Sequence, residues 1–246
     1  MLSKAQSKHI RSLTQQKFRS MHRQFIAEGS KVALEWLHSD MPIDTIVATA
    51  EWHAANTHVI ARHPEAAVHI ASDDDLTALS ALHTPSQVLL VLPYAAAKDV
   101  PNVNEWYLAL DDIQDPGNMG TLIRIADWFG IRHLVCSPNC VDVYNPKVVQ
   151  SAMGSHIRVN IYEAPLADAL PALSAPKFAA TLSGSDVYQA GTHESGVLII
   201  GNESKGISPQ VMALATHWVT IPRTGGAESL NAAVSAGILC ALLLPR

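Results

Sequence analysis

The feature that most constrains the fold is the alternation, over residues 106–246, of short apolar runs with stretches of helical character. Apolar runs bounded by turn residues are typical of buried strands. Strands followed repeatedly by helices predict a mostly parallel sheet with helices on both faces. The predicted strands are 106–112, 133–137, 156–162, 177–183, 196–203 and 217–222, and the predicted helices are 119–129, a segment near 145–153, 167–173, 209–215 and 229–244.

The preceding part of the chain has a different pattern. Residues 3–40 predict helix, because apolar residues recur at three- and four-residue steps on both sides of a Gly-Ser break. Strand-like runs follow at 44–49, 68–71 and 87–93. We therefore predict a small α/β domain over residues 1–95, a linker over 96–105, where Pro, Ala and Asn show little periodicity, and a larger α/β domain over 106–246.

The charge is distributed unevenly along the chain. The net charge is −5, yet residues 1–31 hold seven Lys or Arg against the single acid Glu28, a balance of +6, so the remainder carries −11. A basic arm on an acidic body is typical of polyanion binding. A solvated basic helix without a partner explains the same charges equally well.

Several classes of protein are disfavoured by what the sequence lacks. No apolar run reaches the roughly 18 residues that span a bilayer, and the N-terminus has no apolar signal region, so we expect a cytoplasmic protein. Three cysteines without a CxxC spacing indicate buried thiols in a reducing compartment. Neither a P-loop nor a GxGxxG fingerprint is present, and the scattered histidines predict no metal site.

Three polar segments follow predicted strands, where open α/β sheets bind ligands. The first, DPGNMGTLIR (115–124), puts Arg124 near the front of a helix, although the helix dipole disfavours a cation there. With Gly120 and Asp127 on the same exposed face, Arg124 would be a fixed cation above a glycine-floored opening. The alternative is a surface ion pair between Arg124 and Asp127.

The second segment, VLIIGNESKGIS (197–208), runs from a strand into a glycine turn that frees backbone N–H groups and presents Glu203. The third, 219–244, places Ser229 and Asn231 at the start of the last helix, whose small residues allow close packing. Taken singly, the two segments are equally well explained by a structural turn and by a helix N-cap.

In this order, the three segments resemble the SpoU (TrmH-like) family of RNA ribose 2′-O-methyltransferases, within the SPOUT superfamily. The N-terminal residues also resemble the substrate-binding domain that many members carry, which is similar to a ribosomal-protein RNA-binding fold. The resemblance covers nearly the whole chain. The matching motif positions are Asn118, Gly120 and Arg124, then Gly201, Glu203 and Gly206, and finally Ile221, Pro222, Gly225, Ser229, Leu230 and Asn231.

The resemblance implies a C-terminal α/β domain closed by a deep trefoil knot, a homodimer through that domain, and methyl transfer from S-adenosylmethionine to RNA, rRNA in preference to tRNA. It implies no metal. Because an arginine stays protonated in proteins, we expect Arg124 to act by electrostatic positioning rather than as a base. The implied catalytic residues are Asn118, Arg124, Glu203, Ser229 and Asn231, the cofactor-binding residues are Thr181, Leu182, Gly201, Asn202, Gly206, Ile221 and Leu230, and the RNA-binding residues are Lys17, Arg19, Arg23 and Arg124.

Two other functions are weighed against this one. A knotted RNA-binding protein that has lost catalysis would show the same fold, but every polar motif residue is present. An ordinary nucleotide-dependent enzyme is disfavoured by the missing glycine fingerprints.

Overall fold

The computed structural model describes residues 2–82 and 86–245, which form two compact units. The first unit comprises the chain up to Ala96 together with Asp142–Ile157, and the second comprises Ala97–Val141 and the chain from Arg158 onward. The chain therefore leaves the second unit once, contributes 16 residues to the first, and returns. The second crossing between the units, at Asp142 and Arg158, is not marked by any change in amino-acid composition.

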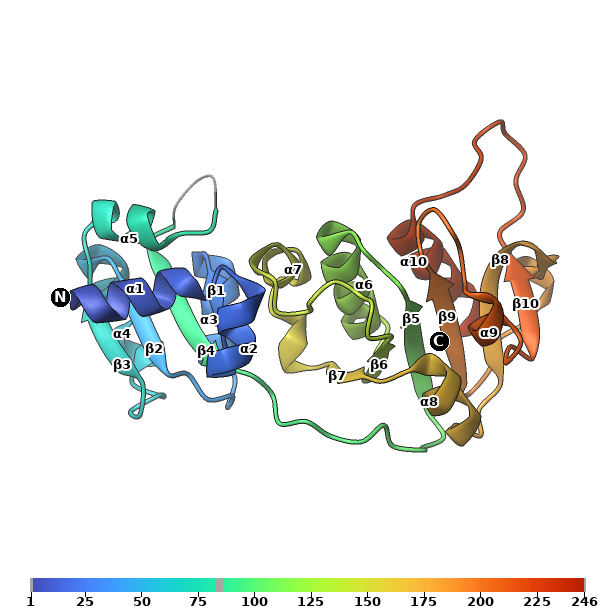
Figure 1. The fold of residues 1–246 in the computed structure, drawn as a ribbon, viewed down its shortest axis with the longest axis horizontal. Helices are drawn as coiled ribbons and strands as arrows, with labels where there is room; N and C mark the ends of the chain where they lie inside the picture. Colours follow the sequence, from blue (N-terminus) through green and yellow to red (C-terminus); the bar gives the residue numbers. More distant parts are fainter. Residues whose placement is uncertain (1, 83–85, 246) are drawn as a thin grey trace. The chain divides into compact units, whose positions relative to one another are not determined.

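The second unit is built on a six-stranded sheet in the order β10-β8-β9-β5-β6-β7 (Figure 1). All five pairs of neighbouring strands in it are parallel. This confirms the α/β architecture with a mostly parallel sheet. The strands are β5 (Trp106–Asp111), β6 (His133–Cys136), β7 (Asn160–Glu163), β8 (Lys177–Asp186), β9 (Gly196–Gly201) and β10 (His217–Thr220), and the helices are α6 (Pro116–Trp128), α8 (Leu166–Ala172), α9 (Pro209–Met212) and α10 (Ala232–Leu243).

Helices cover this sheet on both faces, so residues that point to either side of the central strands are buried. One core joins Tyr107, Ala109 and Ile199 to apolar residues of α8 and α9. On the other face, α6 and α10 pack against each other and lie beside β6 and β9. The central strands β5 and β9 are thus buried almost completely, β5 over its whole length.

Strand β8 carries a large bulge. Its pairing with β10 jumps from Ala179–Trp218 to Ser185–Val219, so residues 180–184 have no partner in β10. Gly184 lies against the β10 backbone there, since an added Cβ would stand 2.6 Å from the carbonyl carbon and oxygen of Trp218. The bulge therefore depends on a residue without a side chain, and it lifts Thr181 and Leu182 out of the ladder.

The first unit has a four-stranded sheet in the order β1-β4-β2-β3, antiparallel except for the β2–β3 pair. One core lies between the sheet and α3 and α4, and a second core lies between the opposite face and α1 and α5. The elements are α1 (Lys4–Ser12), α2 (Gln16–His22), β1 (Gln24–Glu28), α3 (Ser30–His38), β2 (Thr45–Ala48), α4 (Ala50–Ile60), β3 (Ala67–Ile70), α5 (Asp73–Leu79) and β4 (Val88–Pro93).

Continuous helix over residues 3–40 is wrong, because β1 interrupts it. Arg23 ends α2 in the left-handed conformation, with φ of 54°, and the chain then extends and pairs with β4. Phe25, Ile26 and Ala27 are all buried, so the strand is covered on both faces. A strand buried on both faces shows no alternation of apolar and polar residues. Its apolar run therefore looks like a continuation of the helical spacing of the flanking segments.

The excursion of residues 142–157 is part of the first unit's core. Its helix α7 (Pro146–Ala152) contacts β1, and Val149 is buried in the core beneath α3 and α4. The ring of Tyr144 lies 4.6 Å from that of Phe25 and 4.0 Å from that of Tyr94, measured between centroids. The first unit is therefore completed by a segment that re-enters it at Asp142, 46 residues after the chain has left it at Ala96.

Among residues 2–82 and 86–245, no helix is long and apolar enough to cross a membrane.

Candidate active site

The start of α6 is fixed by a helix cap. Asp115 is the N-cap, and its Oδ1 accepts a hydrogen bond from the backbone N–H of Asn118 at 2.8 Å. Pro116 occupies the first helical position, where no intrahelical N–H bond is lost. The helix consequently begins three residues before the predicted start, and Asn118 lies in its first turn.

Three motifs that are far apart in the sequence meet at Asn118. Its Nδ2 donates to Glu203 Oε1 at 2.8 Å, and its Oδ1 accepts from Asn231 Nδ2 at 2.8 Å. Asn231 in turn caps α10, since its Oδ1 accepts the backbone N–H of Ala233 at 2.9 Å. One line of hydrogen bonds thus joins the first turn of α6, the loop after β9 and the start of α10.

Glu203 also accepts from the backbone before α6. The N–H groups of Gln114 and Asp115 point at its two carboxylate oxygens, at 3.5 and 3.4 Å. The carboxylate therefore spans the gap between two loops. This geometry is what an ordering role for Glu203 requires.

Arg124 lies on the exposed face of α6, and none of the described residues hydrogen-bonds or ion-pairs with it. The predicted alternative, a pair with Asp127, is not formed; Asp127 binds Arg158 instead, with Nη2 and Oδ2 2.8 Å apart. Gly120 does not floor an opening beside Arg124, because it is buried on the core side of the helix. The cation is thus available to a group from outside this unit.

Ser229 and Leu230 lie in the exposed stretch 222–231 that precedes α10. Within the part of the chain that the structure describes, Ser229 makes no hydrogen bond, so it is not part of the line through Asn118. Of the five predicted catalytic residues, the structure brings together Asn118, Glu203 and Asn231. The positions of Arg124 and Ser229 leave both side chains open to solvent.

The loop after β9 doubles back tightly on itself. Asn202 and Gly206 exchange two backbone hydrogen bonds of 3.0 and 2.9 Å, and Gly206 has φ of +71°. A Cβ on Gly201 would lie 2.3 Å from the backbone of Gly206 and Ile207. Only glycine fits at position 201, because the returning chain occupies the space of a side chain.

Three predicted cofactor positions have features of a ligand site. The hydroxyl oxygen of Thr181 is buried and has no hydrogen-bond partner within the described chain. Beside it in the β8 bulge, Leu182 is 78% exposed, and Leu230 before α10 is 48% exposed. A buried hydroxyl without a partner is costly, and the large apolar side chain exposed next to it favours a ligand with polar and apolar parts.

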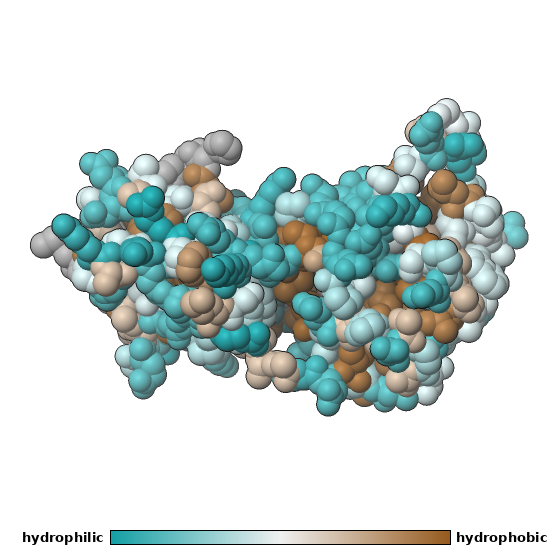
Figure 2. Space-filling view, in the orientation of Figure 1, coloured by the Kyte–Doolittle hydropathy of each residue, from teal (hydrophilic) through white to brown (hydrophobic). Residues whose placement is uncertain are grey.

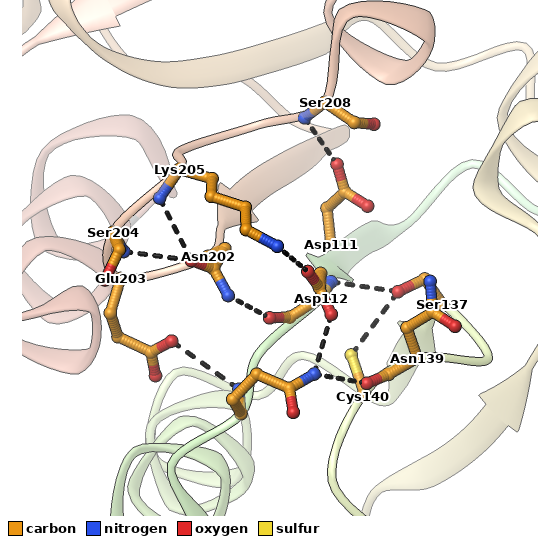
Figure 3. A network of polar contacts seen from close by, with 11 residues as sticks. Asp111, Asp112, Ser137, Asn139, Cys140, Asn202, Glu203, Ser204, Lys205 and Ser208 are labelled. Carbon is orange, nitrogen blue, oxygen red and sulfur yellow. Dashed lines mark hydrogen bonds and ion pairs between the residues drawn. The ribbon is translucent and has the colours of Figure 1, made fainter.

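The sequence did not indicate a polar network behind these motifs, which Figure 3 shows. The buried carboxylate of Asp111 accepts the backbone N–H of Ser208 at 2.7 Å, which anchors the far end of the β9 loop. Asp112, Gln114 and Ser137 continue the network toward β6. The available signal was the Asp-Asp pair at the end of a predicted strand, which by itself is indistinguishable from a turn.

Cys140 belongs to this network and is half-buried, so the prediction of three buried thiols holds only for Cys136 and Cys240. A hydrogen bond from Cys136 is the main cause that lowers the pKa of the Cys140 thiol to about 7, and burial opposes it. The same hydrogen bond, with burial, raises the pKa of Cys136.

In the first unit, the predicted RNA-binding cations have different environments. Lys17 and Arg23 are exposed, with the Arg23 guanidinium 4.8 Å from the ring centroid of Tyr94. Arg19 is only 2% exposed; its guanidinium donates to Asp142 and to the backbone carbonyls of Leu13 and Thr14. The donors of Arg19 are therefore used inside the unit, whereas those of Lys17 and Arg23 face solvent, so its RNA-binding role stays a prediction.

A parallel α/β unit in which three polar loops meet, preceded by a small α/β unit whose first 31 residues are basic, is the arrangement that the resemblance to the SpoU class of methyltransferases predicted. The sequence model of the SpoU rRNA Methylase family matches residues 105–241, and that of the MRM3-like substrate binding domain matches residues 4–90. The chain belongs to the SpoU rRNA methylase family. This confirms the resemblance seen in the three motifs.

Individual relatives agree with the family. The chain is 33% identical over 177 residues to the 23S rRNA (guanosine(2553)-2′-O)-methyltransferase of Bacillus subtilis, with 70% of each protein covered. An RNA methyltransferase structure of the TrmH family from Porphyromonas gingivalis superposes with a TM-score of 0.89 at 36% identity and covers 99% of this chain and 98% of that one. The AdoMet-bound rRNA methyltransferase of Sinorhizobium meliloti gives 0.86 at 27% identity, with 98% and 94% covered.

Proposed function

We propose that this protein transfers a methyl group from S-adenosylmethionine to a ribose 2′-hydroxyl of RNA, with rRNA as the substrate class. The observation that carries the proposal is the hydrogen-bonded line Asn231–Asn118–Glu203, which joins the three motifs of the family in one place. The match to a substrate-binding domain over residues 4–90 and relatives named as rRNA 2′-O-methyltransferases support it.

The residues present fit the cofactor. The Thr181 hydroxyl, which has no partner within the described chain, offers a hydrogen bond to a polar group, and the exposed Leu182 and Leu230 offer apolar surface to an adenine ring. Gly201, Asn202, Gly206 and Ile221 would border the cofactor from the adjoining loops. When bound, S-adenosylmethionine supplies the electrophilic methyl group of its sulfonium. As part of the same proposal, the chain threads into the trefoil knot of the family where these loops cross.

The chain's own residues would then prepare the ribose. Methyl transfer would require the ribose 2′-hydroxyl to be held in line with the methyl group and its proton to pass to solvent. Arg124, an exposed cation to which no described residue is paired, would bind the ribose-phosphate and stabilise negative charge that develops on the oxygen. Asn118 and Glu203 hold the loops in place, while Ser229 and Asn231 would border the substrate.

The decisive experiment is methyl transfer by purified protein from labelled S-adenosylmethionine to rRNA and tRNA transcripts, followed by mapping of 2′-O-methyl sites. We expect methylation of rRNA at one ribose. Arg124→Ala should abolish transfer while cofactor affinity, measured by calorimetry, stays within about twofold, and Arg124→Lys should restore part of the rate. Loss of cofactor binding in Arg124→Ala would contradict a role on the substrate side.

Homodimerisation through the second unit is part of the proposal. Trp128 at the end of α6 is 83% exposed, and Val234 on the neighbouring α10 is 51% exposed. Hydrophobic residues reach the surface of this unit in the face drawn in Figure 2. Arg124 lies one helical turn before Trp128 on α6. A second copy that covers the indole would therefore bring its own surface close to the Arg124 guanidinium.

For the first unit we propose RNA binding through its exposed cations. Charge reversal of Lys17 and Arg23 should weaken RNA binding and reduce its salt dependence by about one slope unit for each phosphate that is no longer bound, with cofactor affinity unchanged. Unaltered RNA affinity in this variant would contradict the role. As part of the same proposal the protein is cytoplasmic, which its similarity to a bacterial rRNA methyltransferase supports.

A catalytically inactive RNA-binding protein is the alternative, and no feature of the described site favours it. Failure to bind S-adenosylmethionine in calorimetry, with RNA binding intact, would establish it in place of the enzyme.

A further inference from the structure

Asp112, the residue that follows β5, has an unusual backbone. Its φ is +60°, one of three positive φ values among the described residues other than glycine. Non-glycine residues in this region are strained and persist only where their surroundings fix them. Aspartate and asparagine tolerate the conformation best of the residues with side chains. We therefore expect the contacts of Asp112 to hold its backbone in this conformation.

The contacts of the Asp112 backbone come from two other segments. The backbone N–H of Asp112 donates to Ser137 Oγ at 2.9 Å, in the loop after β6. Its carbonyl oxygen accepts from Asn202 Nδ2 at 2.8 Å, in the loop after β9. Asp112 is therefore bonded on both sides through its main chain alone, and the left-handed conformation is what lets the two groups point to different loops.

The carboxylate makes a further set of contacts. Its Oδ1 accepts from Gln114 Nε2 at 2.6 Å, and Gln114 Nε2 also donates to the carbonyl oxygen of Asn139 (Figure 3). Its Oδ2 lies 3.9 Å from Lys205 Nζ. That ammonium is 81% exposed, so the pair adds little, whereas the hydrogen bond to the neutral amide of Gln114 lies where the chain turns toward α6.

Gln114 leads directly to the predicted catalytic residues. Its backbone N–H is one of the two that point at the Glu203 carboxylate, which accepts from Asn118. Asn202, which Asp112 binds, is the neighbour of Glu203, and its Oδ1 accepts the N–H groups of Ser204 and Lys205. Asp112 and Glu203 thus connect the same two loops at two separate points.

We propose that Asp112 is a positioning residue for methyl transfer: through Gln114 and Asn202 it sets the register between the loop before α6 and the loop after β9, and so holds Asn118 and Glu203 in their working geometry. It acts through these residues and touches neither the cofactor nor the ribose. The inference rests on the proposed methyltransferase function. Neither the family motifs nor the sequence indicated this residue.

Three substitutions at position 112 separate the backbone from the carboxylate. Asp112→Gly keeps the left-handed backbone without strain but removes the carboxylate. Asp112→Asn keeps an oxygen acceptor for Gln114 and also tolerates the backbone. Asp112→Ala removes the acceptor and strains the backbone. Asp99→Gly, in an exposed part of the linker, is the matched control for adding a glycine.

For methyl transfer to rRNA, we expect kcat of Asp112→Gly to fall by about ten- to a hundredfold, since displacements near 1 Å have such effects. The KM for RNA, the cofactor Kd by calorimetry and the thermal midpoint should remain close to wild type. Asp112→Asn should recover most of kcat. Gln114→Ala should match Asp112→Gly, and the double variant should be no slower than either, because both remove the same hydrogen bond.

Hydrogen–deuterium exchange tests the positioning without any turnover. In Asp112→Gly, amides of residues 112–118 and 203–205 should exchange faster, while those of β9 and the control variant stay unchanged. Unchanged exchange, or an undiminished kcat in Asp112→Gly, overturns the proposal. An equal loss in Asp112→Asn and Asp112→Gly also overturns it, because the negative charge itself would then be required. If wild type methylates no RNA, the proposed function fails, and the exchange result still decides the role of Asp112.

Discussion

The charge pattern and the structure make different predictions for Arg19: the first suggests RNA binding, the second a buried ion pair with Asp142. Its side chain is 2% exposed and that of its partner Asp142 is 12% exposed, and Nε and Oδ2 lie 2.9 Å apart. Arg19→Ala would leave a carboxylate largely buried without its cation, together with two carbonyl oxygens that lose their donor. Removing one partner of a buried ion pair typically costs about 3–5 kcal/mol.

We therefore expect Arg19→Ala to destabilise the first unit by at least about 3 kcal/mol, which lowers its thermal midpoint by roughly 10 °C or more for a unit of this size. Differential scanning calorimetry with urea unfolding gives the measurement. Arg19→Met combined with Asp142→Leu should regain most of the stability, because apolar residues of similar volume replace buried pairs at little cost. Lys17→Ala, at an exposed neighbour, should stay within about 0.5 kcal/mol of wild type.

The opposite pattern would refute this reasoning. If Arg19→Ala leaves the thermal midpoint unchanged and instead weakens RNA binding with a shallower salt dependence, the guanidinium is available to RNA as the charge distribution suggested. In that case the pair with Asp142 would contribute nothing to stability.

Three further outcomes are expected. Burial lowers the pKa of His156 to about 4 from an ordinary 6.5, so between these values the unfolded chain binds the proton and the folded chain does not. Stability should fall as pH drops from 6.5, by roughly 3 kcal/mol at pH 4, and urea midpoints of His156→Gln should depend less on pH. Trp128→Glu should convert a dimer to a monomer in light scattering; a dimer that persists would place the interface elsewhere. At neutral pH, iodoacetamide should label Cys140 well before Cys136 and Cys240, as peptide mass spectrometry can follow; equal labelling would contradict its lowered pKa of about 7.

The parallel sheet of the second unit was predictable because its strands are short apolar runs that alternate with helices. The three motifs were predictable through the resemblance, and Asn118, Glu203 and Asn231 do meet. The bond between Asn118 and Glu203 spans 85 residues, and no local pattern specifies such a contact. Strand β1 was missed because its apolar residues are buried on both faces and continue a helical spacing.

The burial of Arg19 could not be foreseen for a related reason. Charge counts treat every arginine in a basic segment alike, whereas burial depends on a partner 123 residues away, Asp142. Asp112 was overlooked because positive φ in a non-glycine residue leaves no trace in composition. In each case the deciding interaction joins residues far apart in the sequence, and a local pattern does not show which partner a residue contacts.

The excursion Asp142–Ile157 has a consequence for how such proteins can be rearranged. A fragment that ends at Ala96 would lack Val149 from its core and the Tyr144 ring, which stacks on Tyr94 and contacts Phe25. Exchange of the first unit between relatives, in evolution or by design, would therefore require two pieces of chain to move together. The first unit is not encoded by one continuous stretch of chain, because Asp142–Ile157, which completes its core, lies between the two parts of the second unit.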